Sequence, residues 1–482
     1  MSSGLFNIAR SALLTHQTAL QTISHNIANA ETPGYTRQEA VLATNTPVRL
    51  PNGTVGTGVH VETIIRKRDI LLDENFRTAS GQTGDAEMRR DLLSQMEGIF
   101  GEPSDAGMST ALDQFWGAWS DLASSPGSSA SRGIVQQRGR QVAQLFNGYD
   151  TQLTQQRESA MERLSGTVAQ INQYAGQIAE LNGQIMSAES GGDSANDLRD
   201  RRDLALDRLS AIAGTRVINQ ANGNVSVLIG NSTLVDGTSA RPLSMQLEIP
   251  TPPPTVTPSD LPVRIRLGTS PDRLAPLGGE LKALVETINT DIPGMRGRLD
   301  AMASSIATSV NSAHTAGYVF SGNTIPGTAA GNFFDAGTVV NPVRAGTLRL
   351  DAVIAGDASK IAASSDANAP TDNTTALALS ALRTTGATVS YTTPGGVVET
   401  GTFLGFFRNT VTSLGINVRS ADDDASIYRT LADQGEARRQ SVSGVSTDEE
   451  LVNMLRVQQS YTAATKLIQA ADEMLQTLLS LI

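Results

Sequence analysis

Residues 447–482, TDEELVNMLRVQQSYTAATKLIQAADEMLQTLLSLI, decide how the rest of the chain is organised. Apolar residues recur along this stretch at alternating spacings of three and four, which is the pattern of a coiled-coil seam. Thr447 and Glu450 have the spacing of a capping box, which predicts that the helix begins there. Such a helix is about 50 Å long, and its apolar face needs a partner. The seam consists of Met454, Val457, Tyr461, Ala464, Ile468, Ala471, Leu475, Leu478 and Ile482.

A second seam of the same kind lies at the other end of the chain. Its helix should end near Thr32, because Pro33 disfavours helical backbone there and Pro33-Gly34 suits the middle of a type II turn. Two striped ends favour terminal helices that cover each other and are completed by neighbouring subunits, although an ordinary helical bundle also carries such stripes. The second seam consists of Phe6, Ala9, Leu13, His16, Leu20, Ile23, Ile27 and Ala30.

The composition argues against several classes of function. The chain has 48 acidic and 37 basic residues and a net charge of -11, whereas a nucleic-acid binder needs a basic face. It has no cysteine, so disulfides, thiolate metal sites and cysteine nucleophiles are excluded. No apolar run is long enough to span a membrane, and on this ground alone we expect a cytoplasmic protein.

The order of periodic patterns, helix then β then helix, predicts a multidomain α+β fold. Residues 1–55 and 440–482 are expected to form a domain of paired terminal coiled-coil helices. An antiparallel helical body is expected from residues 56–213, 278–312 and 403–439, with its longest helix over 152–189 and a return helix over 196–213. Within residues 35–61 we expect a linker or a hairpin arm rather than a packed domain. The β-rich outer modules, residues 214–277 and 313–402, are expected as insertions at the far end of an elongated molecule.

Residue patterns that could carry chemistry are weak. His16 and His25 lie nine apart on a helix, without the spacing that places two metal ligands on one face. The triplet of aspartates at 422–424 could contribute to a calcium site, but a charged helix start is the better interpretation. Residues 197–203, DLRDRRD, form either an ionic lock between helices or a solvated face. We predict no catalytic residue, no cofactor and no metal site.

Both ends of the chain carry motifs of one known class. Residues 24–37, SHNIANAETPGYTR, resemble the A-N-x-x-T-P-G-Y signature of bacterial flagellar axial proteins, which are the rod, hook and hook-associated proteins. Residues 443–450, SGVSTDEE, and 458–464, QQSYTAA, resemble C-terminal elements of the same class. The signature positions here are Ala28, Asn29, Thr32, Pro33, Gly34 and Tyr35.

Four internal stretches are similar to the hook-associated members of this class in particular. They are residues 178–182 (IAELN), 197–203 (DLRDRRD), 278–281 (GGEL) and 311–314 (NSAH). The resemblance implies a structural adaptor that joins hook to filament, and not an enzyme.

The resemblance also implies partners and a location. The chain would form a tubular homo-oligomer, with the hook protein and the second hook–filament junction protein as neighbours, and without nucleic acid or membrane insertion. It would pass unfolded through the flagellar type III export apparatus, after a cytoplasmic stage in which a chaperone, FlgN in the family, holds the C-terminal helix. Its final place would be the extracellular flagellum. The interaction residues would be the C-terminal seam together with Phe6, Leu13, Leu20, Ile23 and Ile27.

Two alternatives stay open. The chain could be another axial protein, such as the hook protein or the second junction protein. It could also be a secreted hydrolase with its site in the β-rich insert, where Asp335, Asp351 and Asp357 supply carboxylates.

Overall fold

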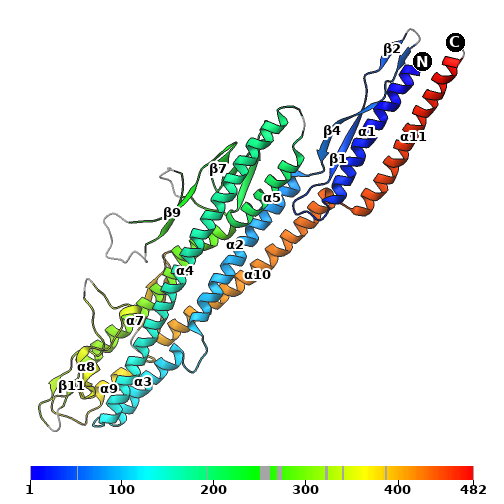
Figure 1. Cartoon of the computed structure of the whole chain (residues 1–482). Helices are drawn as coiled ribbons and strands as arrows, with labels where there is room; N and C mark the ends of the chain where they lie inside the picture. The colour runs from blue at the N-terminus through cyan, green and yellow to red at the C-terminus, as the bar shows by residue number, and fades with distance from the viewer. Residues whose placement is uncertain are drawn as a thin grey trace.

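The computed structural model describes residues 2–50, 53–192, 194–249, 261–268, 274–320, 324–338, 341–385 and 388–480. The molecule is an elongated rod whose long helices run close to its axis, and both chain ends lie at the same end of the rod (Figure 1). In the described part of the chain, no helix has the length and hydropathy needed to cross a membrane.

The terminal end of the rod is built from both ends of the sequence. Helix α1 (Ser2–Ala28) and helix α11 (Thr447–Ser480) run antiparallel and side by side (Figure 1). Strands β1 (Gln38–Thr44) and β4 (Val59–Arg66) form an antiparallel ribbon that β2 (Val48–Leu50) and β3 (Gly53–Val55) extend, which confirms the expected hairpin arm. The ribbon lies on α1, where the Thr15 hydroxyl donates to the Val59 carbonyl (3.0 Å).

Long helices form the middle of the rod. They are α2 (Ile70–Phe100), α4 (Ser129–Glu189), α5 (Asn196–Ala213) and α10 (Phe403–Ser443), and the short helix α6 (Gly279–Glu286) packs against α2, α4 and α5. The predicted return helix 196–213 is confirmed by α5. The predicted start of the longest helix at 152 is wrong, because α4 begins at Ser129 and continues its buried stripe through Val135, Val142 and Phe146 into a second core.

The first β-rich segment packs against the side of the middle rather than at the far end of the rod (Figure 1). Strands β5 (Thr215–Asn219), β6 (Val225–Ile229), β7 (Ser232–Asp236) and β8 (Ser239–Ala240) form one antiparallel sheet, and β9 (Leu243–Leu247) pairs with β10 (Val263–Leu267). This sheet lies beside the middle of the rod because its apolar face, with Val227 and Leu234, packs against α5 and against Ile171 and Ile178 of α4. The expected far-end position of this module is therefore wrong.

The far end of the rod has its own aromatic core. Helix α3 (Met108–Ser124), α7 (Ile292–Thr315), the first half of α4, the end of α2 and the start of α10 carry it, and the π turn Thr287–Asp291 precedes α7. Residues 313–402 cover this core mainly with loops, the 3-10 turns Ala345–Thr347 and Ala358–Lys360, and short helices α8 (Ala352–Gly356) and α9 (Thr374–Ala381). Their strands are short: β11 (Tyr318–Val319), β12 (Thr328–Ala329), β13 (Val389–Thr392) and β14 (Val398–Gly401). The buried aromatic rings of this core are Phe100, Phe115, Trp116, Trp119, Phe146, Tyr149, Phe333, Phe334, Phe403, Phe406 and Phe407.

Candidate functional site

The seam between α1 and α11 is only partly covered in one chain. Ala464 and Ala471 of α11 and Ala9 and Ile23 of α1 are buried. Phe6 and Leu475 keep 43% and 37% of their surface exposed, although the pattern places both in the seam. The side chain of Leu478, and Ile482 altogether, lie outside the described residues. The half-buried members are Leu13, His16, Leu20, Ile27, Ala30, Met454, Val457, Tyr461 and Ile468.

Helix α11 carries a second apolar stripe that nothing in the described chain covers. We name this set the outer stripe; its spacings of three, four and eight keep its members on one side of the helix. The exposed fractions are 66% at Val452, 45% at Leu467 and 48% at Met474. The polar side of α11, which includes Gln469 and Gln476, is a third sector. The outer stripe consists of Val452, Leu455, Ala463, Leu467, Ala470 and Met474, all exposed.

The start of α11 differs from the capping-box prediction. The helix begins at Thr447 as expected, but the Ser446 hydroxyl accepts the backbone N–H of Glu449 (3.4 Å). The carboxylate of Glu450 points into the protein, with 2% of its side chain exposed. The Thr447–Glu450 capping box is therefore wrong, because Glu450 has charged and amide partners from the other end of the chain.

Glu450 joins α11 to the N-terminal segment. Arg37 Nε donates to Glu450 Oε1 (2.8 Å), and Asn26 Nδ2 donates to Glu450 Oε2 (3.0 Å). The amide oxygen of Asn26, Oδ1, accepts from the Tyr35 hydroxyl (2.8 Å) and from the backbone N–H of Gln38 (2.9 Å). Burial, followed by the nearby carboxylates including Glu450, raises the pKa of Tyr35, so its hydroxyl stays protonated and donates.

The signature turn fixes the direction of the chain after α1. The backbone N–H of Tyr35 donates to the Thr32 carbonyl (3.1 Å), and Gly34 has φ +81°, which confirms the type II turn at Pro33-Gly34. A side chain at Gly34 would also meet Leu204 of α5 at 3.1 Å. Ala28, Thr32 and Pro33 are exposed, while Asn29 is half-buried and donates from Nδ2 to the His25 carbonyl (3.0 Å). The turn thus brings the following residues against α5.

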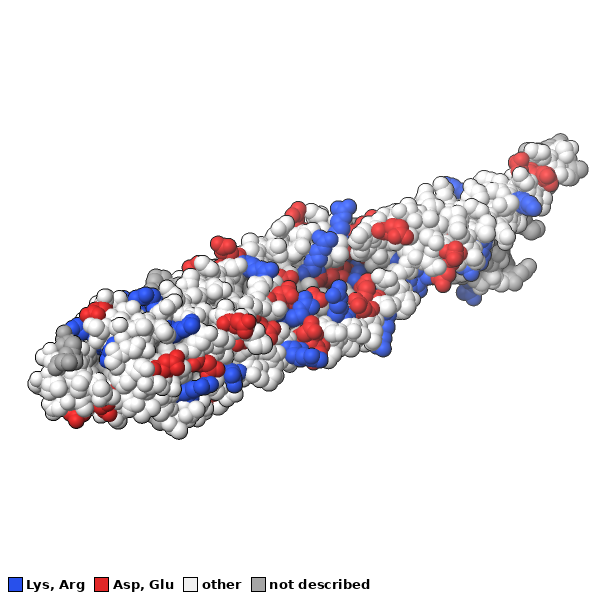
Figure 2. Space-filling view, turned by 90° about the horizontal axis from the view of Figure 1, so that it is seen from below, with Lys and Arg blue, Asp and Glu red and all other residues white. Residues whose placement is uncertain are grey.

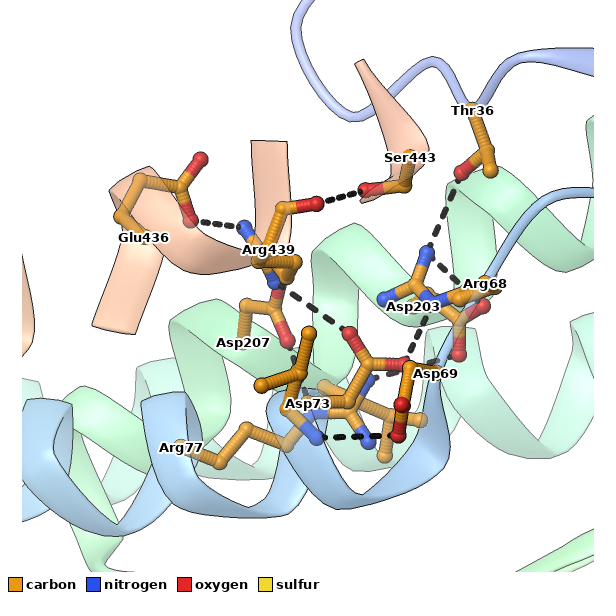
Figure 3. Close-up of polar contacts among 12 residues, drawn as sticks. Thr36, Arg68, Asp69, Asp73, Arg77, Asp203, Asp207, Glu436, Arg439 and Ser443 are labelled. Atoms are coloured by element: carbon orange, nitrogen blue, oxygen red, sulfur yellow. Dashed lines mark hydrogen bonds and ion pairs between the residues drawn. The ribbon is translucent and has the colours of Figure 1, made fainter. Parts of the chain in front are cut away.

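A cluster of four arginines and four aspartates lies below this turn, between the terminal end and the middle of the rod. Figure 3 shows Arg68, Asp73, Arg77, Asp203, Asp207 and Arg439 pointing toward one another from α2, α5, α10 and the segment before α2. All eight side chains are at most 16% exposed. We name it the arginine–aspartate cluster, and its members are Arg66, Arg68, Asp73, Arg77, Asp200, Asp203, Asp207 and Arg439.

Asp203 is the centre of this cluster. Arg66 (2.8 Å), Arg68 (3.2 Å) and Arg77 (3.4 Å) all contact its carboxylate. Burial raises its pKa, but the three guanidinium groups outweigh burial and hold the pKa of Asp203 below its ordinary value. The ionic-lock interpretation of residues 197–203 is confirmed for Asp200 and Asp203, whereas Arg201 is exposed to solvent. The sequence could not show this, since the arginine partners lie about 130 residues away.

The internal motifs hold loops in place. Asn182 Nδ2 donates to the carbonyls of Val225 (3.0 Å) and Gly237 (2.7 Å), and its Oδ1 accepts from Arg202 (3.0 Å). Asn311 Oδ1 accepts the backbone N–H groups of residues 333 and 334 in the same way at the far end. These side chains replace the backbone partners that the loops lack.

The carboxylates proposed for a hydrolase have local structural roles. Asp351 and Asp357 accept backbone N–H groups two residues ahead, at Val353 and Ser359 (2.9 Å each). Asp335 accepts the N–H of Gly337 and pairs with Arg349, and these contacts lower its pKa. A glycosidase acid needs a raised pKa, and the contacts of Asp335 shift its pKa in the opposite direction.

Other candidate residues are also explained by the fold. The aspartates at 422–424 lie inside α10 and are exposed, so the predicted helix start there is wrong. His25 Nδ1 shares a hydrogen bond with the Tyr35 hydroxyl (3.1 Å), and His16 is half-buried in the seam. Within the described ranges, no group of three histidine, aspartate or glutamate residues is placed to hold a metal ion.

Charge is unevenly distributed along the molecule. Figure 2 shows acidic and basic side chains interleaved over the middle of the rod and sparser toward the narrow terminal end. On the face drawn in Figure 2, charged side chains are therefore denser over the middle of the rod than toward its terminal end.

Paired terminal helices joined through a T-P-G-Y turn to a long helical body define a flagellar axial protein. Sequence comparison agrees at both ends: residues 6–36 match the family described as flagella basal body rod protein, and residues 438–481 match the C-terminal family of the flagellar basal body rod FlgEFG proteins.

The middle of the chain identifies the family within this class. Residues 93–334 match the helical domain of flagellar hook-associated protein FlgK. Flagellar hook-associated protein 1 of Bacillus subtilis is 30% identical over 509 aligned residues, which cover 98% of this chain and 97% of that protein. The Escherichia coli protein of the same name is 25% identical and covers 99% of this chain and 100% of its own length. The chain belongs to the flagellar hook-associated protein 1 (FlgK) family, and is thus a structural protein of the hook–filament junction.

A solved structure supports the fold. The flagellar hook junction protein FlgK from Burkholderia pseudomallei superposes with a TM-score of 0.64 at 19% identity, covering 77% of this chain and all of that chain.

Proposed function

We propose that the chain polymerises into a tube through its terminal helices, with α11 contacting α1 of its own chain by the seam and a neighbouring subunit by the outer stripe. The observation that carries this proposal is the width of the apolar surface on α11. Helix α1 covers only the seam side, while Val452 and Met474 stay 66% and 48% exposed. An exposed apolar surface of this kind favours association with a second surface.

The apolar surface of α11 is also the basis for the order in which we propose that partners bind. In the cell, a bare apolar stripe promotes aggregation, so we propose that an export chaperone of the FlgN type binds α11 before export through the type III apparatus. Outside the cell the subunit then contacts the hook protein, the second junction protein and its own copies. The chain acts without catalysis in this proposal, which is supported by the structural roles of Asp335, Asp351 and Asp357.

Three pairs of adjacent positions on α11 test the proposal. Leu467 and Met474 lie in the outer stripe, Ile468 and Leu475 in the seam, and Gln469 and Gln476 on the polar side. Aspartate replaces both residues of one pair at a time, so each variant carries the same added charge at the same depth of the helix. Incorporation at hook tips is scored in cells that lack the wild-type chain, and chaperone binding by gel filtration with purified chaperone.

The three variants have different expected results. Gln469→Asp with Gln476→Asp assembles normally. Ile468→Asp with Leu475→Asp loses both assembly and protection of α1 from hydrogen exchange, because the intramolecular pair opens. Leu467→Asp with Met474→Asp keeps that protection and loses assembly. Normal junctions from the outer-stripe variant would contradict the proposal.

A further inference from the structure

We infer that Glu450 is a positioning residue, which couples the pairing of α11 with α1 to one orientation of the terminal helices relative to the helical body. Its importance for the junction rests on the proposed function. The coupling itself is a property of a single chain and can be measured without assembly.

Glu450 is a buried charge, and its hydrogen-bond partners come from the opposite end of the chain. The Glu450 side chain is 2% exposed, and its two oxygens accept from Arg37 Nε and Asn26 Nδ2. A carboxylate removed from water without partners is strongly unfavourable. Glu450 can therefore be buried only when α11 lies on α1 in the register that brings these two donors to it.

Asn26 and Arg37, which donate to Glu450, are themselves held by further hydrogen bonds. The Asn26 amide oxygen accepts from the Tyr35 hydroxyl and the Gln38 N–H, so the amide cannot rotate without losing two hydrogen bonds. The backbone N–H of Arg37 donates to the Ser443 carbonyl (2.9 Å) in the last turn of α10. The site that receives Glu450 is thus fixed by both α1 and α10.

Thr36, next to Arg37, connects this site to the helical body. The backbone N–H of Thr36 donates to Asp200 of α5 (3.0 Å), and its hydroxyl accepts from Arg68 Nη1 (3.3 Å). Both Asp200 and Arg68 belong to the arginine–aspartate cluster, and Figure 3 shows Thr36 directed at Arg68. A continuous series of buried and half-buried polar contacts therefore runs from α11 through residues 26–38 to α5 and α2.

The neighbouring residue provides a natural comparison. Glu449 also approaches Arg37, at 3.7 Å from Nη1, but 67% of its side chain is exposed. Exposed ion pairs contribute little, so Glu449 should not fix the orientation. Removing the charge of Glu450 tests a buried carboxylate with two partners. Removing the charge of Glu449 tests an exposed carboxylate at the neighbouring position, so comparing the two variants shows whether burial is what matters.

The experiment measures the distance between the two parts of one chain. The chain has no cysteine, so spin labels can be placed on cysteines introduced at the exposed positions Gln177 of α4 and Gln469 of α11. Pulsed electron resonance then gives the distribution of their separation in the full-length monomer. The variants are Glu450→Gln, Glu449→Gln and Tyr35→Phe, with far-UV circular dichroism to check that the helices remain.

Wild type and Glu449→Gln should give one narrow distribution. Glu450→Gln should broaden it at least about twofold, because glutamine presents one donor to a site that already holds two donors. Tyr35→Phe removes the hydroxyl that bonds Asn26 and His25 but leaves both donors of Glu450 in place, so it should broaden the distribution less. A narrow distribution for Glu450→Gln, equal broadening for Glu449→Gln, or a broad wild type would each overturn the inference.

The outer-stripe variant separates this inference from the assembly proposal. Leu467→Asp with Met474→Asp should keep the narrow distance distribution whether or not it assembles, since neither residue touches the Glu450 site. Broadening in that variant would show that the orientation depends on α11 as a whole rather than on Glu450.

Discussion

At the residue scale, His314 makes the far end of the rod sensitive to acid. The ring is fully buried, with Nδ1 bonded to the Gly331 carbonyl (2.7 Å) and Nε2 accepting the backbone N–H of Ala362 (2.9 Å). Burial lowers the pKa of His314 from 6.5 to about 4. A histidine with a depressed pKa stabilises the fold fully above pH 6.5, and this stability is lost as the pH falls from 6.5 toward 4.

The prediction is that His314→Gln removes this part of the pH dependence. A glutamine amide can donate to Gly331 and accept from Ala362 but does not titrate. Between pH 7 and pH 4, wild type should lose about 3 kcal/mol of unfolding free energy more than the variant. Trp116 and Trp119, the two tryptophans of the chain, lie in the same core, so denaturation followed by their fluorescence reports on this end alone. Equal losses in the two proteins would contradict the prediction.

Single residues were also the hardest features to predict from sequence. Glu450 is three residues after Thr447 and therefore matched a capping box, yet its partners Asn26 and Arg37 are more than 400 residues away. Local spacing carries no signal for a contact of that separation. The type II turn at Pro33-Gly34 was predictable because its requirement is local: Pro fixes φ at one position and Gly permits positive φ at the next.

At the element scale, the close approach of α2 and α5 explains one glycine of α2. A Cβ added at Gly84 would lie 2.1 Å from the backbone carbonyl oxygen of Ala211. Gly176, on the exposed side of α4, has nothing within 4 Å of its added Cβ. The two glycines therefore differ in their surroundings and not in their secondary structure.

Replacing each glycine with alanine should shift stability in opposite directions. Gly176→Ala should raise the free energy of unfolding by about 0.5–1 kcal/mol, because alanine is the better helix former. Gly84→Ala should lower it by about 1–3 kcal/mol, because α2 and α5 must separate to admit the methyl group. Denaturant titrations followed by circular dichroism measure both. Stabilisation by Gly84→Ala would show that the helices are not in close contact in solution.

Periodicity predicted whole elements better than their ends. The apolar stripes of α1 and α11 followed from their alternating spacings of three and four residues, and the return helix α5 followed from Gly214 at its end. The turn residues of 35–61 predicted a linker or a hairpin arm there. The start of α4 was missed because Ser129 to Gly148 changes partners from the middle core to the aromatic core while the helix continues. The aspartates at 422–424 resembled a helix start, but α2 supports α10 along this region and the helix does not break.

At the scale of the whole molecule, the terminal helices are an appendage of two self-sufficient cores. Among the residues that the structure describes, neither the aromatic core of the far end nor the core around α4, α5 and the β5–β8 sheet contains a residue from 1–65 or 440–482. What joins the terminal end to them is polar: the Glu450 site, the signature turn and the arginine–aspartate cluster. Hydrogen bonds and ion pairs depend on direction more strictly than apolar contacts do, so polar contacts at this junction constrain how the terminal helices lie on the body.

This division predicts that the body folds without the terminal helices. A chain of residues 66–439 keeps Arg66 and Arg439 and therefore the whole arginine–aspartate cluster. Its tryptophan fluorescence and its denaturation midpoint should match those of the full chain. Because α11 extends along the rod axis and has 34 residues, the maximum dimension from small-angle X-ray scattering should fall by about 40–50 Å. A decrease below about 20 Å would mean that the terminal helices fold back along the body in solution. Loss of the fluorescence signal would mean that the cores depend on them.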